Sequence, residues 1–148
     1  GSLLIALVVL FTVGLYLYLK WTQSQPMLAE LAGLVFMLLA IWMFFLTIRA
    51  SREGWLRMAF DEEGPRGLVE AGPYKYVRHP FYVSYLIFFS AFALATWSPV
   101  AIGPLIIIAI IYVLAARMEE RLFARTPMAA SYDAYRKRTG FFWPKFGS

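Results

Sequence analysis

Two short clusters of charged residues carry most of the side chains that could do chemistry in this sequence. The first is Arg78-His79-Pro80, which contains the only histidine of the chain and leads into an apolar run. The second is Glu119-Glu120, which follows another apolar run. A guanidinium facing a carboxylate suits a zwitterionic ligand, and the carboxylate can bind an ammonium group or ribose hydroxyls. Arg78 facing Glu120 would therefore form a site for such a ligand.

Proline chemistry defines the first cluster. Pro80 disfavours helical geometry at His79 and is itself favoured in the first turn of a helix. Arg78 and His79 are therefore predicted on a non-helical approach to a helix N-terminus, whose free N–H groups and positive dipole suit a carboxylate or phosphate. In the second cluster, Arg117 and Glu120 are three apart on one helical face and can pair, whereas Glu119 is expected to point elsewhere.

Each cluster also has an ordinary structural explanation. Basic residues often mark the ends of membrane spans, and a Glu-Glu pair after a span is often only a solvated helix surface. Tyr74, Tyr76 and Tyr82 close to the histidine favour a functional site. The sequence has no GxGxxG, P-loop or GxSxG motif, which argues against a soluble nucleotide site and a serine hydrolase. Because the chain has one histidine and no cysteine, no metal site of the zinc or haem kind is expected.

The elements that must position these clusters are apolar helices. The chain is 61% hydrophobic and 16% charged, with a mean hydropathy of +0.63, against about 45–50% apolar and about 25% charged for a globular domain. The 148 residues are expected to form a single domain, 1–148, of all-α class. We predict an integral membrane helical bundle with about four transmembrane helices and cytoplasmic C-terminal helices. The predicted spans are residues 3–19, 27–48, 81–97 and 100–116.

The connections between spans are expected to hold the chemistry. They are the segment 49–80 and the tail 117–148. Residues 49–63 fit either a helix in the headgroup region or a solvated loop. A short helix is predicted around Tyr132 and Tyr135, and the aromatic residues 141–144 are expected to return to the membrane interface. Because spans three and four form a tight hairpin, their charged ends should be neighbours in space.

Charge predicts the orientation. Of the 14 Lys and Arg residues, all but Lys20 lie in the two connections that hold the clusters. The positive-inside rule places that side in the cytoplasm. The net charge of +5 is expected to meet an anionic membrane surface, and nucleic acid is not an expected partner.

The segment LVEAGPYKYVRHPFYVSY, followed by EERL and YDAYRKR, resembles the isoprenylcysteine carboxyl methyltransferase family, whose relatives include phospholipid N-methyltransferases. The resemblance runs over residues 68–144. It implies S-adenosylmethionine as methyl donor, bound near the cytoplasmic surface, and a lipophilic substrate that enters from the bilayer. Ser84 and the segment 126–131 depart from the family pattern. The resemblance implies cofactor contacts at Tyr76, His79, Pro80, Tyr82 and Glu120, and catalytic roles for Arg78 and Glu119.

Such a site fits methyl transfer, which needs alignment and desolvation more than proton handling. A carboxylate acceptor is already ionised at neutral pH, whereas an amine acceptor would need a base such as His79 or a glutamate. Two alternatives stay open: an NADPH-dependent membrane reductase of the sterol-reductase type, and a membrane subunit without enzymatic activity.

Overall fold

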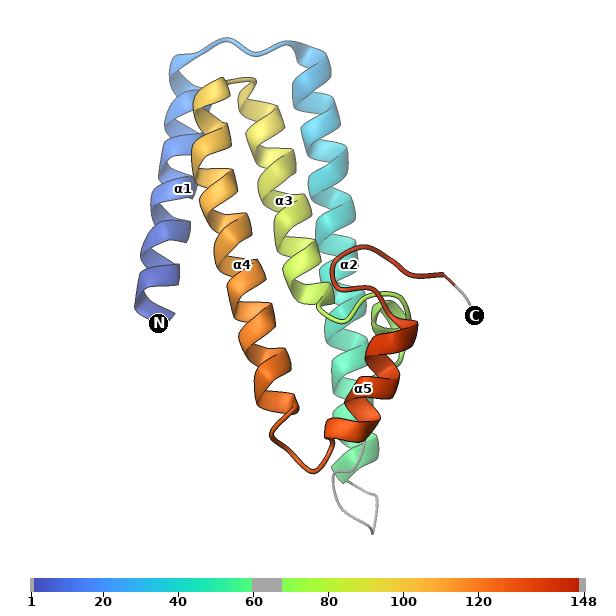
Figure 1. Ribbon diagram of the computed structural model, residues 1–148. Coiled ribbons are helices and arrows are strands. Elements are labelled where there is room, and N and C mark those ends of the chain that lie inside the picture. Colours follow the sequence, from blue (N-terminus) through green and yellow to red (C-terminus); the bar gives the residue numbers. More distant parts are fainter. Residues whose placement is uncertain (1, 60–67, 147–148) are drawn as a thin grey trace. The chain divides into compact units, whose positions relative to one another are not determined.

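The computed structural model describes residues 2–59 and 68–146, and every regular element in these two ranges is helical (Figure 1). The prediction of an all-α chain is confirmed. The elements, in chain order, are α1 (Ser2–Thr22), α2 (Met27–Ala59), the 3₁₀ turn η1 (Gly72–Lys75), α3 (Pro80–Thr96), the 3₁₀ turn η2 (Pro99–Ala101), α4 (Ile102–Phe123) and α5 (Ala129–Arg138).

Prolines define the starts of α3 and of the turn before α4. Pro80 is the first residue of α3, and the residue before it is outside the helix, as predicted. Trp97 ends α3 with a left-handed backbone (φ 51°), and Pro99 opens η2, which runs directly into α4. Pro104 lies in the first turn of α4, where no helical hydrogen bond is lost.

The second predicted span is part of a longer helix. α2 continues without interruption to Ala59, so the beginning of the 49–63 segment is helical and is not a loop. The end of that segment, residues 60–63, lies outside the described residues. The chain forms two compact units. Unit 1 comprises Gly1–Ile41 and Tyr85–Ala115, and unit 2 comprises Trp42–Ser84 and Ala116–Ser148.

Small residues bring the helices of unit 1 into close contact. A Cβ atom on Gly33 of α2 would lie 2.7 Å from the Cβ atom of Ala95 in α3, so only glycine fits there. Tyr16 of α1 is fully buried and donates a hydrogen bond to the carbonyl of Ala101 (2.8 Å), and its ring meets Phe92 edge to face. Packing through small residues and interhelical hydrogen bonds is typical of membrane helices.

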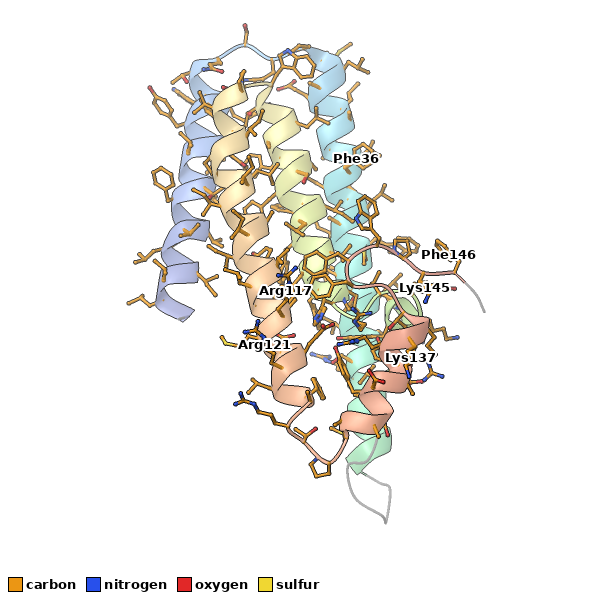
Figure 2. All side chains as sticks on the ribbon, viewed as in Figure 1. Phe36, Arg117, Arg121, Lys137, Lys145 and Phe146 are labelled. Atoms are coloured by element: carbon orange, nitrogen blue, oxygen red, sulfur yellow. The ribbon has the colours of Figure 1, made fainter. Side chains whose placement is uncertain are left out.

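The outward faces of the helices in unit 1 are apolar. Phe36, which is 49% exposed, projects from α2 away from α3 (Figure 2). Three helices are long and apolar enough to cross a membrane, namely Leu3–Thr22, Met27–Gly54 and Pro99–Phe123, and the apolar helix Pro80–Thr96 is shorter. These exposed apolar faces fit lipid and not water as their solvent. The chain is an integral membrane protein, with about four membrane helices.

Candidate functional site

All the residues of the candidate site belong to unit 2. Its base is the extended segment before α3, where Val77 forms a parallel β-bridge with Gly140 of the C-terminal tail. The Arg78 N–H donates to the carbonyl of Gly140, and the Gly140 N–H donates to the carbonyl of Tyr76, both at 2.9 Å. The Tyr135 hydroxyl on α5 donates to the carbonyl of Tyr74 (2.8 Å). These bonds fix the backbone that carries Arg78 and His79.

Three side chains converge on one carboxylate oxygen, Oε1 of Glu120 on α4. Arg78 Nε donates to it at 2.6 Å, the Tyr132 hydroxyl donates at 3.2 Å, and His79 Nε2 lies 3.2 Å away. The Glu120 side chain is only 15% exposed, and a buried carboxylate needs such partners. The two charged clusters are therefore neighbours in space, as the hairpin predicts.

Glu119 joins the same cluster, which corrects the expectation that it points elsewhere. Its Oε1 accepts a hydrogen bond from the Tyr82 hydroxyl at 2.6 Å, and its Oε2 lies 3.4 Å from His79 Nδ1. The carboxylates of Glu119 and Glu120, which are consecutive on α4, both reach the His79 imidazole, because the ring lies between them. Glu119 is 49% exposed, so it forms the solvent-facing side of the cluster.

His79 therefore lies between two carboxylates, with each ring nitrogen facing one of them. A neutral imidazole donates from one nitrogen only, whereas an imidazolium donates from both. The ring is 6% exposed, and it is enclosed by Phe141, whose centroid lies 5.1 Å away, and by Phe142 at 6.1 Å. His79 is held in one orientation, as a proton carrier or ligand contact would need to be.

Arg78 joins three segments of unit 2. Besides Glu120, its guanidinium donates from Nη1 to the carbonyls of Thr139 (2.6 Å) and Arg136 (3.2 Å) at the C-terminal end of α5. A cation at a helix C-terminus is favoured by the helix dipole. Its Cζ atom also lies 5.6 Å from the Phe141 ring centroid. The sequence predicted that Arg78 would bind the anionic group of a ligand. In the structure, three of the five N–H donors of its guanidinium are hydrogen-bonded to the protein itself.

The aromatic tail folds onto the site, where we had expected it to return to the membrane interface. Phe141 and Phe142 stack on each other (4.5 Å) and pack against His79. Gly140 permits this turn, since a Cβ there would lie 1.7 Å from the carbonyl oxygen of Trp143. Trp143 itself, at 86% exposed, points away.

The remaining predicted residues have other surroundings. Tyr76 is 45% exposed and packs on Phe146 (5.3 Å between ring centroids), apart from the carboxylates. Pro80 and Ser84 are fully buried, and the Ser84 hydroxyl donates to the carbonyl of Phe81. The pairing predicted between Arg117 and Glu120 is wrong, because Glu120 pairs with Arg78 and His79.

Tyr132 and Tyr135 on α5 are buried phenols close to this cluster. Burial, and then the nearby Glu120 carboxylate, raise the pKa of the Tyr132 hydroxyl well above its usual range. Burial also raises the pKa of the Tyr135 hydroxyl. Both hydroxyls therefore keep their protons at neutral pH and act as hydrogen-bond donors. The Tyr132 ring is stacked on Phe123 at 4.8 Å, which fixes the direction of its hydroxyl.

Sequence reasoning placed Tyr132 on a short helix but did not assign it to the site. It missed Thr139, Phe141 and Phe142 as site neighbours altogether. The available signal was Gly140 between a basic helix end and two phenylalanines, a pattern typical of a chain that turns back after a helix.

The assembled groups suit an organic cation better than a metal ion. Two carboxylates and a tyrosine hydroxyl can accept hydrogen bonds from ammonium or ribose hydroxyl groups, and aromatic rings attract cations. Within residues 2–59 and 68–146, no group of three or more metal-binding side chains is placed to hold a metal ion.

A model of the phospholipid methyltransferase family matches residues 28–126 of the chain, and this family includes isoprenylcysteine carboxyl methyltransferase-like proteins. The matched range contains both charged clusters, Arg78-His79-Pro80 and Glu119-Glu120. It ends before α5 and the aromatic tail. Comparisons with curated proteins and with solved structures return no match.

Proposed function

Because the chain belongs to the phospholipid methyltransferase family, we propose that this membrane methyltransferase uses S-adenosylmethionine to methylate a lipophilic acceptor. The observation that carries the proposal is His79, which lies between the Glu119 and Glu120 carboxylates, 3.4 and 3.2 Å away. That arrangement brings together the two segments that carry the sequence resemblance, Arg78-His79-Pro80 and Glu119-Glu120.

The residues of the cluster fit the proposed cofactor. S-adenosylmethionine supplies an electrophilic methyl group on a positively charged sulfonium. The carboxylate of Glu120 would accept hydrogen bonds from its ammonium or ribose hydroxyls, and Tyr82 and His79 would complete the polar contacts. Pro80 begins α3, whose free N–H groups suit the cofactor's carboxylate. Tyr76 remains a proposed contact on the outer, exposed side.

Two residues have proposed roles in the reaction itself. Glu119 is half exposed and hydrogen-bonded to Tyr82, so it is the better-placed carboxylate to take a proton from an amine acceptor. A carboxylate acceptor would need no such base. Arg78 would act by holding Glu120 and the end of α5 in position, and its unused N–H donors would face an anionic acceptor.

The substrate is proposed to be a lipid or prenylated compound that reaches the site through the bilayer. The family match and the apolar exposed helices support an acceptor of this kind. An acceptor with a carboxylate, of the isoprenylcysteine type, is our first choice. We further propose that unit 2 faces the cytoplasm, because all Lys and Arg residues except Lys20 belong to it.

Calorimetric titration of the purified, detergent-solubilised protein tests the cofactor assignment. Wild type should bind S-adenosylmethionine and not NADPH, and Glu120→Gln should weaken that binding on the order of tenfold, because a charged hydrogen-bond acceptor is lost. Glu70→Gln is the matched control. It removes the same charge from the exposed Glu70–Arg138 ion pair (2.6 Å) of the same unit, and it should bind like wild type.

Two results would count against the proposal. Binding of NADPH in place of S-adenosylmethionine would support a reductase. Equal affinities of Glu120→Gln and wild type would remove Glu120 from the cofactor site. A thermal unfolding scan of each variant separates loss of binding from loss of folding.

A further inference from the structure

The C-terminal part of α4 has two opposite faces, and only one of them belongs to the candidate site. Successive helix residues are rotated by about 100°, which places Ala116, Glu119, Glu120 and Phe123 on one side. Ala116 is fully buried, and Phe123 stacks on Tyr132. This is the inner face of α4 in unit 2.

The outer face carries Arg117 and Arg121, one helical turn apart, next to Met118 and Leu122, and Arg125 lies in the turn that follows α4. The three arginines are exposed, and Met118 and Leu122 are 60% and 58% exposed. Figure 2 shows Arg121 on the side of α4 that faces away from α5. Three exposed guanidinium side chains therefore lie on the end of α4 and in the turn after it, together with two large exposed apolar side chains.

Several other surface cations of unit 2 have an acidic partner close by. Arg49 pairs with Glu53, and Arg136 and Lys137 both pair with Asp133. Arg117, Arg121 and Arg125 have no acidic partner among the residues that the structure describes. Arg117 and Arg121 are four residues apart, a rise of about 6 Å along the helix axis, and Arg125 follows within one further turn of chain, so their like charges favour a bound anion.

We propose that the outer face of α4 binds the headgroup phosphate of an anionic phospholipid, with the acyl chains beside Met118 and Leu122. α4 is part of a helix long and apolar enough to cross a membrane, so its end meets the headgroup layer. Guanidinium groups bind phosphate oxygens in pairs, and basic residues close to a membrane surface attract anionic lipids. The exposed apolar pair favours a lipid over a soluble anion.

This lipid site is separate from the candidate methyl-transfer site, because the two occupy opposite faces of the helix. The proposal therefore does not depend on the identity of the cofactor or acceptor.

Spin-labelled lipids test the proposal. The full chain is reconstituted in phosphatidylcholine vesicles that contain a trace of spin-labelled phosphatidylglycerol or spin-labelled phosphatidylcholine. The fraction of each spin-labelled lipid that the protein immobilises gives the relative association constant of the two lipids for the protein. Wild type should prefer phosphatidylglycerol, and the triple variant R117Q/R121Q/R125Q should lose this preference, a change on the order of fivefold.

The matched control is R49Q/R136Q/K137Q, which removes three charges from cations that have local acidic partners. It should keep the wild-type preference. An unchanged preference for phosphatidylglycerol in R117Q/R121Q/R125Q would overturn the proposal. An equal loss of preference in both triple variants would also overturn it, because net charge alone would then determine the lipid preference. If the triple variant does not fold, Arg121→Gln alone should reduce the preference, and an unchanged value would contradict the proposal equally.

Discussion

Glu120 illustrates how single residues position the proposed chemistry. A carboxylate that is 15% exposed is held by three side chains from two segments, which fixes both its rotamer and its charge. Arg78 and His79 come from the approach to α3, and Tyr132 comes from α5. Under the proposed function, each donor would contribute to cofactor binding through Glu120, even where it does not touch the cofactor.

Tyr132→Phe should weaken the cluster without disturbing its packing. The substitution removes the hydroxyl that donates to Glu120 and keeps the ring stacked on Phe123. We expect a loss of about 1–2 kcal/mol in stability and weaker binding of S-adenosylmethionine. Burial raises the pKa of the Tyr132 hydroxyl, and the pKa of the Glu120 carboxyl is lowered, because against the effect of burial the hydrogen bonds and charges of Arg78 and His79 favour its ionised form. The phenol therefore keeps its proton and the carboxylate stays ionised, so the effect should not vary between mildly acidic and neutral pH.

Thermal unfolding and calorimetry measure this effect. Tyr18→Phe is the control, because Tyr18 is 63% exposed and its loss should change neither value. If Tyr132→Phe matches wild type in both measurements, the hydroxyl does not support Glu120.

The proximity of the two charged clusters was predictable from sequence, whereas the direct pairing of Glu120 with Arg78 and the role of Tyr132 were not. A proline after His79 and a short hairpin are enough to bring the two charged ends together. The contact of Tyr132 depends on the direction in which α5 leaves the turn after Phe123, and no local pattern encodes that direction. For the same reason, the pairing of Glu120 was wrongly assigned to Arg117, a neighbour in sequence.

Among the helices and their connections, the tail after α5 is the element that sequence reasoning described least well. Its residues are aromatic, and composition alone suggested a membrane interface. In the structure a β-bridge to Val77 and a turn at Gly140 direct Phe141 and Phe142 onto His79. Such a long-range bridge has no signature in the local sequence.

Gly140→Ala should release this tail. Its new Cβ would lie 1.7 Å from the Trp143 carbonyl oxygen, so the backbone must move, and overpacking of this kind costs about 1–3 kcal/mol. Hydrogen exchange should become faster at the amides that bond to the Tyr76 carbonyl, those of residue 140 and Lys145. Mass spectrometry of peptides that cover residues 139–146 measures this.

Gly14→Ala is the control for this substitution. Nothing lies within 4 Å of a Cβ at Gly14, and alanine is favoured over glycine in a helix by about 0.5–1 kcal/mol. This variant should be as stable as wild type or slightly more stable. Wild-type exchange of the tail in Gly140→Ala would show that the turn does not hold it.

The distribution of charge over the whole chain predicts which side of the membrane unit 2 faces. The chain has no cysteine, so single cysteines report their own accessibility. Gln23→Cys, in the connection between α1 and α2, should react with an impermeant maleimide in intact cells. Lys137→Cys on α5 should react only after the membrane is opened. The reverse pattern would place the site on the outside.

Composition and the lengths of the apolar runs were enough to predict that the whole chain is a helical membrane protein and to predict the order of its helices. The helix bounds did not follow as well, since α2 extends to Ala59 and α4 to Phe123. Charged residues end a membrane span but do not end a helix, because the backbone hydrogen bonds continue into the aqueous layer. Both charged extensions belong to unit 2, which holds the candidate site.

Transfer of a labelled methyl group tests the central claim most directly. Reconstituted protein is incubated with S-adenosylmethionine that carries tritium in its methyl group and with a membrane lipid extract, and label in the organic phase is counted. Wild type and Glu70→Gln should transfer label to a lipid product, and His79→Ala and Glu120→Gln should not. Transfer by those two variants at the wild-type rate, or no transfer by wild type that binds the cofactor, would contradict the account.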